Sequence, residues 1–104
     1  DLFATNDERL KMGIEKKAAN TLLLKVNQIG TVSEALKTAA MARNNRFEIT
    51  ASLRSGETND TFQADLAVAV GAKQMKLGSP VRGERNGKYN RLMRIEDDLM
   101  SAVI

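Results

Sequence analysis

The residues of this sequence that best suit chemistry are basic, and they stand at the ends of three strand-like runs. Lys25 lies in the apolar run TLLLKV, and Lys76 lies in the run KQMKL. Arg54 and Ser55 follow the run FEITAS. In a parallel sheet or barrel, side chains at the carboxyl ends of the strands converge on one rim. The spacing therefore predicts a shared site made of three cations and a hydroxyl.

The chemistry that such a site favours is the binding of a small anion together with proton transfer. An unpaired charge inside an apolar strand is costly, and a lysine that loses its hydration favours the neutral amine, which can take a proton. Arg54, Ser55 and nearby backbone amides suit a phosphate or an oxyanion. A lysine at a strand end is, however, more often extended to solvent or paired with a carboxylate. Three basic groups at equivalent positions leave both interpretations open.

The composition excludes several classes of catalyst. The 104 residues contain no His and no Cys, which excludes Ser-His-Asp triads, thiolate nucleophiles, disulfides and His-ligated metals within them. Proton transfer then falls to Lys, Asp, Glu or Tyr. No apolar run approaches the roughly 18 residues of a membrane span and no signal peptide is visible, so we expect a soluble protein of the cytoplasm.

The charge balance argues against a nucleic-acid-binding module. Sixteen Lys and Arg against thirteen Asp and Glu leave a net charge of +3, and aromatic residues make up only 4 % of the chain. A basic series near the last expected helix lacks the interleaved aromatic residues on which nucleic-acid bases stack. Its members are Arg82, Arg85, Lys88, Arg91 and Arg94.

Acidic residues are expected in structural roles. Glu34 completes the T-x-x-E capping box that begins at Thr31. Glu57 and Asp60 precede a helix and suit its positive N-terminal end better than a metal ion. Residues 96–98, which read EDD, predict a solvated helix face.

Hydrophobic periodicity and turn residues predict alternating helices and strands in one domain or part of one. The strand-like runs begin at residues 21, 47 and 73, an even spacing of 26 residues that is typical of equal βα units in a parallel sheet. The chain begins with Asp1, so we expect a processed chain or a piece of a longer one. We expect strands over residues 21–26, 47–52 and 73–77, and helices of about a dozen residues after the N-cap Asn6, from Val32 to about Asn44, over 58–70, and from about Tyr89 to Val103.

Apolar residues at three- and four-residue steps predict which side of each helix is buried. The run TLLLKV, in turn, predicts a strand buried on both faces. The expected buried side of the first helix holds Leu10, Ile14 and Ala18, and that of the second holds Val32, Leu36, Ala39 and Ala40.

Several separate motifs resemble the C-terminal part of enolase. They are LLLKVNQIGT, SLRSGETNDTF, ADLAV and the stretch from GSPVRGER to KYNRLMRIEDDL. They occur in the family's order and spacing, and the similarity extends from the opening DLFATN to about Leu99. The resemblance implies an α/β fold in which residues 1–104 form the C-terminal three or so βα units of an enolase-type TIM-like (β/α)8 barrel. These units are incomplete on their own and lack the N-terminal enolase domain.

The resemblance also implies an activity and a role for each site residue. Enolases, or phosphopyruvate hydratases, are lyases of glycolysis that interconvert 2-phosphoglycerate and phosphoenolpyruvate with two magnesium ions. Lys25 matches the base that removes the α-proton, whereas Arg54 and Ser55 match the residues that hold the phosphate. Lys76 matches a contact to the carboxylate and hydroxyl end of the substrate. Magnesium would stabilise the enediolate and so ease removal of the α-proton.

Two departures from the family pattern bear on activity. Family members usually read SHRSGE where this chain reads SLRSGE from Ser52. Leu53 therefore replaces an active-site His. The resemblance places Leu53 and Ser52 among the substrate-binding residues, together with Arg54, Ser55 and Lys76. Asp1 matches the second residue of an Asp pair whose first member is a metal ligand. On that alignment the metal ligands, the catalytic acid and the N-terminal domain lie outside these residues.

Two functional hypotheses follow. In the first, the chain is part of an enolase and needs the rest of the enolase chain or another subunit to complete its barrel; the resemblance leaves a homodimer open. In the second, it is a non-catalytic, enolase-derived binding or structural subunit, which Leu53 favours. The retained polar site residues favour the enzyme, because a decayed site would lose its costly lysines as readily as its histidine. For the isolated 104 residues we expect neither a stable monomer nor turnover.

Overall fold

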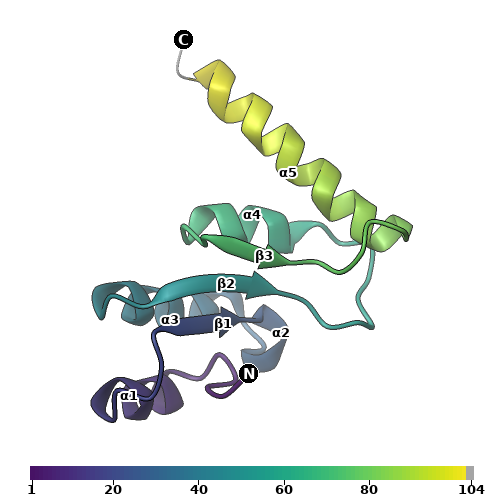
Figure 1. Ribbon diagram of the computed structural model, residues 1–104. Helices are drawn as coiled ribbons and strands as arrows, with labels where there is room; N and C mark the ends of the chain where they lie inside the picture. The colour runs from purple at the N-terminus through teal and green to yellow at the C-terminus, as the bar shows by residue number, and fades with distance from the viewer. Residues whose placement is uncertain (103–104) are drawn as a thin grey trace.

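The computed structural model describes residues 1–102, in which five helices alternate with three strands (Figure 1). The alternation expected from the hydrophobic periodicity is confirmed. The periodicity gave no sign of α2 (Val26–Ile29), a single turn that follows Lys25; its C-cap is Gly30, whose φ of 98° lies in the left-handed region. The elements are α1 (Asp7–Glu15), β1 (Thr21–Leu24), α2 (Val26–Ile29), α3 (Val32–Asn44), β2 (Glu48–Ser52), α4 (Phe62–Ala69), β3 (Gln74–Lys76) and α5 (Gly83–Ala102).

The three strands form one parallel sheet in the order β1-β2-β3. Leu24 pairs with Ala51 at the end of β1, and Ser52 pairs with Lys76 at the end of β3. All three strands therefore end at the same side of the sheet, which we call the carboxyl edge (Figure 1). This edge is where a parallel α/β sheet gathers its functional side chains.

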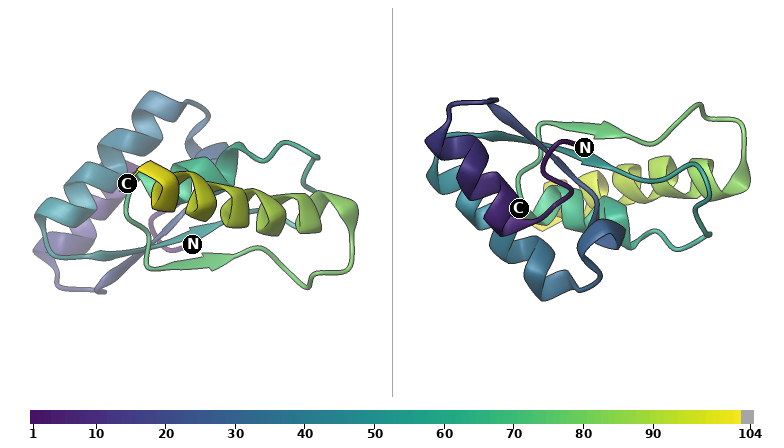
Figure 2. Two further views of the ribbon diagram at one scale, coloured as in Figure 1. Left: turned by 90° about the horizontal axis from the view of Figure 1, so that it is seen from above. Right: turned by 90° about the horizontal axis from the view of Figure 1, so that it is seen from below.

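Helices cover one face of the sheet. Figure 2 shows α3 and α4 on one side, and the described residues place no helix on the other. Leu22, Leu24 and Ile49 point to the covered face and are buried, whereas Leu23 and Thr50 point to the other face and are only half-buried. The expectation of a strand buried on both faces is therefore wrong for this part of the fold, because only one face is packed.

The predicted N-caps are confirmed. The side chain of Asn6 accepts a hydrogen bond from the backbone N–H of Arg9, and the Thr31 hydroxyl accepts one from the N–H of Glu34. Each cap satisfies one of the donors that a helix start leaves unpaired. α1 ends at Glu15, however, so Ala18 lies beyond the helix and is exposed.

An ion pair joins α1 to α3. Lys37 Nζ lies 3.0 Å from an Asp7 carboxylate oxygen. The hydrogen bond from Lys37 lowers the pKa of the Asp7 carboxyl below its usual value, and the same contact raises the pKa of Lys37.

The buried side of α3 differs from the expected one. Val32, Leu36 and Ala40 are exposed, so their assignment to the buried side is wrong. Small residues face the sheet instead, and they let the helix lie close to β1 and β2, which it contacts. The buried residues of α3 are Ala35, Thr38, Ala39 and Ala42.

The last two helices begin at positions that differ from those expected. α4 starts at Phe62 rather than near residue 58, because the Asp60 carboxylate accepts a hydrogen bond from the Phe62 N–H and fixes the first turn there. α5 already begins at Gly83, packs against α4 and then extends away from the sheet (Figure 1). The expected last helical position, Val103, lies outside the described residues. No described helix has both the length and the apolar character that a membrane crossing requires.

Candidate active site at the carboxyl edge of the sheet

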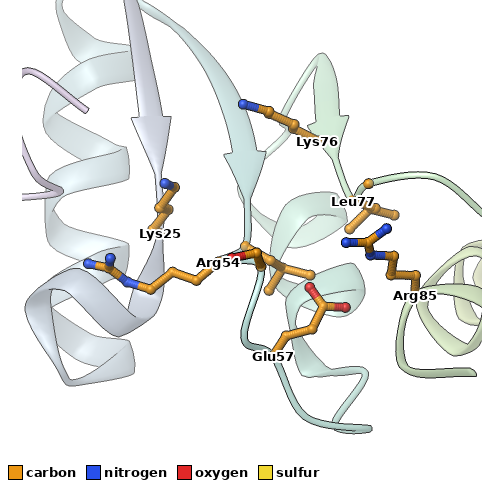
Figure 3. A pocket seen from close by; sticks show the side chains of 9 residues that line it. Lys25, Arg54, Glu57, Lys76, Leu77 and Arg85 are labelled. Carbon is orange, nitrogen blue, oxygen red and sulfur yellow. The ribbon is translucent and has the colours of Figure 1, made fainter. Parts of the chain in front are cut away.

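A cavity of about 360 Å³ opens at the carboxyl edge, where the three strands lead into loops (Figure 3). Its size is in the range of small-ligand pockets. Five of the six expected site residues line it, so the structure brings together side chains that are up to about fifty positions apart in the sequence. We call it the carboxyl-edge pocket; its lining residues are Lys25, Leu53, Arg54, Ser55, Glu57, Lys76, Leu77, Gly78 and Arg85.

Lys25 lies immediately after β1, not inside the strand as expected. Its side chain is only 12 % exposed, and its Nζ atom lies 3.1 Å from a carboxylate oxygen of Asp1. The backbone N–H of Lys25 donates to the hydroxyl of Thr5, which is itself fully buried. Gln28 also donates to Asp1, from α2. The segment before α1 thus fixes both the backbone and the amine of Lys25.

Lys76 is exposed, and its expected burial is wrong. Lys76 is two residues from Gln74, which pairs with Thr50, so it lies on the face of the sheet that no described helix covers. In Figure 3 the Lys76 side chain reaches from β3 towards the end of β2, above the pocket. Lys76 supplies a cation to the rim of the pocket, as the strand-end argument expects. Because its side chain is exposed, its ammonium group keeps its hydration.

Arg54 and Ser55 lie in the loop of residues 53–61, between β2 and α4, and both are exposed. Ser52 is buried at the end of β2 and does not line the pocket, although it was expected among the substrate-binding positions. Its hydroxyl donates to the carbonyl of Leu53. The side chain of Gln63 in α4 donates to the Ser52 carbonyl at 3.1 Å and so ties the loop's origin to the helix. Leu53 presents an apolar side chain to the pocket.

Two further charged residues line the pocket, and sequence reasoning missed both as site residues. Arg85, in the first turn of α5, points towards the space between β2 and β3 (Figure 3). Its guanidinium lies so close over Gly78 that a Cβ there would meet Arg85 Nε at 2.8 Å, and Gly78 also has a φ of +83°. In the sequence Arg85 belongs to the basic series near the last helix, and nothing there connects it with the residues at the strand ends.

Glu57, the second of these residues, forms a buried ion pair rather than the expected helix-end contact. Its carboxylate lies 2.9 Å from Nζ of Lys88, and the two side chains are 7 % and 1 % exposed. Lys88 thus differs from the other members of the basic series, because residues of the 53–61 loop cover its side chain.

The charges around the carboxyl-edge pocket favour an anion. Four cationic side chains come from four different elements or their ends, and the only carboxylate on the lining belongs to Glu57, which Lys88 neutralises. Guanidinium groups bind phosphate and carboxylate oxygens in pairs, and lysines bind them as point charges. The geometry suits a small ligand with more than one negative charge.

The described residues do not by themselves fit a metal site. Within residues 1–102 no group of three or more carboxylates gathers in an arrangement that would hold a metal ion. The Glu57 carboxylate in the pocket is already engaged with Lys88. The position of any metal ligands outside the described residues stays a prediction of the resemblance.

Comparison with known proteins identifies relatives over the whole chain. Residues 1–104 match the family model described as "Enolase, C-terminal TIM barrel domain". The chain is 59 % identical to an enolase of Beutenbergia cavernae over 104 residues, which cover 100 % of this chain and 24 % of that enolase. It is 61 % identical over 99 residues to an enolase of Methanocaldococcus jannaschii, covering 95 % of this chain and 23 % of that one.

An enolase of Methanosarcina mazei is similar to the same extent, with 59 % identity over 99 residues that cover 95 % of this chain and 23 % of that enolase. The chain therefore spans about a quarter of the length of the curated relatives it matches. The three parallel strands and their helices agree with an incomplete part of an α/β barrel. Because the family match extends over all 104 residues, the chain belongs to the family of the enolase C-terminal TIM barrel domain.

Proposed function

We propose that this chain is the proton-abstracting and anion-binding part of an enolase that interconverts 2-phosphoglycerate and phosphoenolpyruvate. One observation carries the proposal. A single pocket at the carboxyl edge joins Lys25, a lysine with little solvent exposure, to three further cations. A phosphorylated carboxylic acid has two anionic groups for these cations, and the remaining amine is free to act on the carbon between them.

Each pocket residue has a defined task in this proposal. Arg54 and Ser55 hold the phosphate, and Lys76 contacts the carboxylate and hydroxyl end. The amine of Lys25 takes the proton from C2 of 2-phosphoglycerate, and the electron pair of that C–H bond becomes the C2–C3 double bond. The C3 hydroxyl leaves as water with a proton from an acid outside this chain, which gives phosphoenolpyruvate.

The proposal includes features that the described residues do not contain. The magnesium ions, their ligands and the proton donor would come from the remainder of an enolase. A role in glycolysis, a cytoplasmic location and a homodimer belong to the same proposal. What the chain supplies is the basic half of the site.

The test requires these residues in a complete barrel. We define the chimera as the Beutenbergia cavernae enolase in which this chain replaces the 104 aligned residues. The 59 % identity, over an alignment that covers 100 % of this chain, supports the exchange. The chimera should form phosphoenolpyruvate from 2-phosphoglycerate when Mg²⁺ is present. A folded chimera that binds 2-phosphoglycerate but never dehydrates it would contradict the proposal.

Leu53 favours a second candidate function, a non-catalytic enolase-derived binding or structural subunit. An apolar side chain on the pocket wall contributes no hydrogen bond to an anionic substrate. This candidate expects that the chimera stays inactive and that Leu53→His alone does not restore turnover. The enzyme proposal expects activity that rises with the histidine.

A further inference from the structure

Lys88 is the largest of the fully buried side chains among the described residues, and the proposed reaction does not use it. Its side chain is 1 % exposed, and its Nζ atom donates three hydrogen bonds. The acceptors are Glu57 Oε1 at 2.9 Å, the Thr58 carbonyl at 2.8 Å and the Glu84 carbonyl at 2.6 Å. An ammonium group has three donors, so every one is satisfied.

Two of these acceptors belong to the 53–61 loop, which otherwise has little support. A second cavity of about 300 Å³ shares Leu53 and Glu57 with the carboxyl-edge pocket, so the loop has open space on two sides. The loop contains no helix or strand, and Arg54 and Ser55 in it are exposed. The Lys88 contacts, which span about thirty positions of sequence, join this loop to α5.

The same ion pair sets the charge of the pocket. Glu57 lines the pocket beside the cations, and an unpaired carboxylate there would repel an anionic ligand. Lys88 lies in the second cavity's lining rather than in the pocket's, so it neutralises Glu57 from behind without contacting the ligand.

We propose that Lys88 is a positioning residue: through Glu57 and the Thr58 carbonyl it fixes the 53–61 loop, and it keeps the pocket's only carboxylate neutralised. This inference rests on the proposed function of Arg54 and Ser55. It assigns Lys88 to substrate affinity, whereas a merely structural lysine would affect only stability.

The test is a double-variant cycle in the chimera. Lys88→Met leaves Glu57 unpaired, so the KM for 2-phosphoglycerate should rise by about tenfold or more, with a smaller change in kcat. Adding Glu57→Gln removes the unpaired charge and should bring the KM part of the way back. The matched control is Arg91→Met, which removes another ion pair that joins α5 to α4, Arg91 with Asp65 at 2.8 Å, outside the pocket. It should leave the KM unchanged.

Two results would overturn the inference. One is a Lys88→Met chimera with a lower thermal unfolding midpoint and an unchanged KM. The other is a double variant whose KM stays as high as that of Lys88→Met alone, because neutralising Glu57 would then be irrelevant to affinity.

Loss of one partner of a buried ion pair is strongly destabilising, so Lys88→Met can fail to fold. Glu57→Gln and Glu57→Ala then decide the question, because Lys88 keeps its two carbonyl acceptors in both. The amide of Gln still accepts from Lys88 and should preserve the KM, whereas Ala leaves only the Thr58 contact between Lys88 and the loop and should raise the KM. Equal KM values for these two variants would contradict the inference.

A readout without turnover separates this inference from the proposed function. Binding of inorganic phosphate, measured by isothermal titration calorimetry, should weaken in Lys88→Met and in Glu57→Ala but not in Arg91→Met. An inactive chimera that shows this pattern would overturn the enolase reaction and support the role of Lys88. An active chimera whose phosphate affinity is the same in all variants would support the enolase reaction and overturn the role of Lys88.

Discussion

Two lysines with little solvent exposure lie near the 53–61 loop, and they differ in how many hydrogen-bond positions their partners leave free for a ligand. Lys88 donates to three acceptors and has no donor left for a ligand. Lys25 contacts one carboxylate, that of Asp1, which is itself 63 % exposed, and it opens into the carboxyl-edge pocket. A saturated ammonium serves structure, whereas an amine with free positions can exchange a proton with a ligand. The residue contacts therefore favour Lys25 as the base.

Leu53 gives the first prediction at this scale. Its side chain lines the pocket where family members usually have His, so Leu53→His adds a hydrogen-bond donor near the proposed anion. A hydrogen bond to a charged group corresponds to about tenfold or more in affinity. We expect kcat/KM of the chimera for 2-phosphoglycerate to rise by that factor, measured by initial rates.

The control for this substitution is Leu53→Met, which keeps the volume and the apolar character. It should leave kcat/KM near that of the parent chimera. If histidine and methionine gave the same value, Leu53 would have no part in the weak substrate contacts that we ascribe to it.

At the scale of elements, close packing around α1 fixes the segment that holds Lys25. Phe3 is buried against Gly13 of α1, and its ring lies 6.2 Å from that of Phe47, centroid to centroid. Thr5, two residues further on, accepts the hydrogen bond from the backbone of Lys25. The fit between Phe3 and Gly13 therefore positions the residues that hold the proposed base.

Replacing each of two helical glycines by alanine should change the stability of the protein in opposite directions. A Cβ on Gly13 would meet the Phe3 ring at 2.2 Å, so Gly13→Ala should destabilise the protein by about 1–3 kcal/mol. A Cβ on Gly87 in α5 would meet only Thr61 at 3.6 Å, an ordinary contact. Gly87→Ala should therefore stabilise by about 0.5–1 kcal/mol, because glycine costs that much in a helix.

Thermal unfolding midpoints of the two chimeric variants check this pair. The account requires a lower midpoint for Gly13→Ala and a higher one for Gly87→Ala. A Gly13→Ala midpoint equal to that of the parent would mean that Phe3 does not pack against α1 as described.

Local signals in the sequence predicted most of the elements, and the strand-end argument predicted three of the pocket's four cations but not Arg85. The T-x-x-E pattern at Thr31, the apolar runs of the strands and the cap at Asn6 act over a few residues, so one sequence suffices to read them. The Lys88–Glu57 pair joins positions 31 apart. In the sequence alone, nothing distinguishes Lys88 from the other basic residues near the last helix. Burial of this pair and exposure of Lys76 depend on which elements cover them, which periodicity does not encode.

For the whole molecule, the main feature is surface that the described chain leaves uncovered. The outer sides of β1 and β3 have no strand neighbour within residues 1–102, and one face of the sheet has no helix. A groove of about 430 Å³ along α4 and α5 is lined almost entirely by apolar side chains. Several of these are at least two-fifths exposed, namely Val68, Met93, Leu99 and Met100.

Open strand edges and exposed apolar surface predict the behaviour of the isolated 104 residues. Unpaired strand edges associate, and a small domain that buries little apolar surface is marginally stable. We expect the isolated chain to unfold without a cooperative transition in urea, followed by circular dichroism, and to show no turnover of 2-phosphoglycerate. A cooperative transition whose midpoint does not depend on protein concentration would contradict this prediction.

The most direct test of the account is exchange of the α-proton of 2-phosphoglycerate with solvent deuterium, followed by NMR on the chimera with Mg²⁺. If Lys25 is the base, the chimera exchanges this proton. The Lys25→Met variant binds the ligand but exchanges about 10² to 10⁴ times more slowly. An equally slow rate in the parent chimera, or undiminished exchange in Lys25→Met, would contradict the central claim that this chain supplies the base.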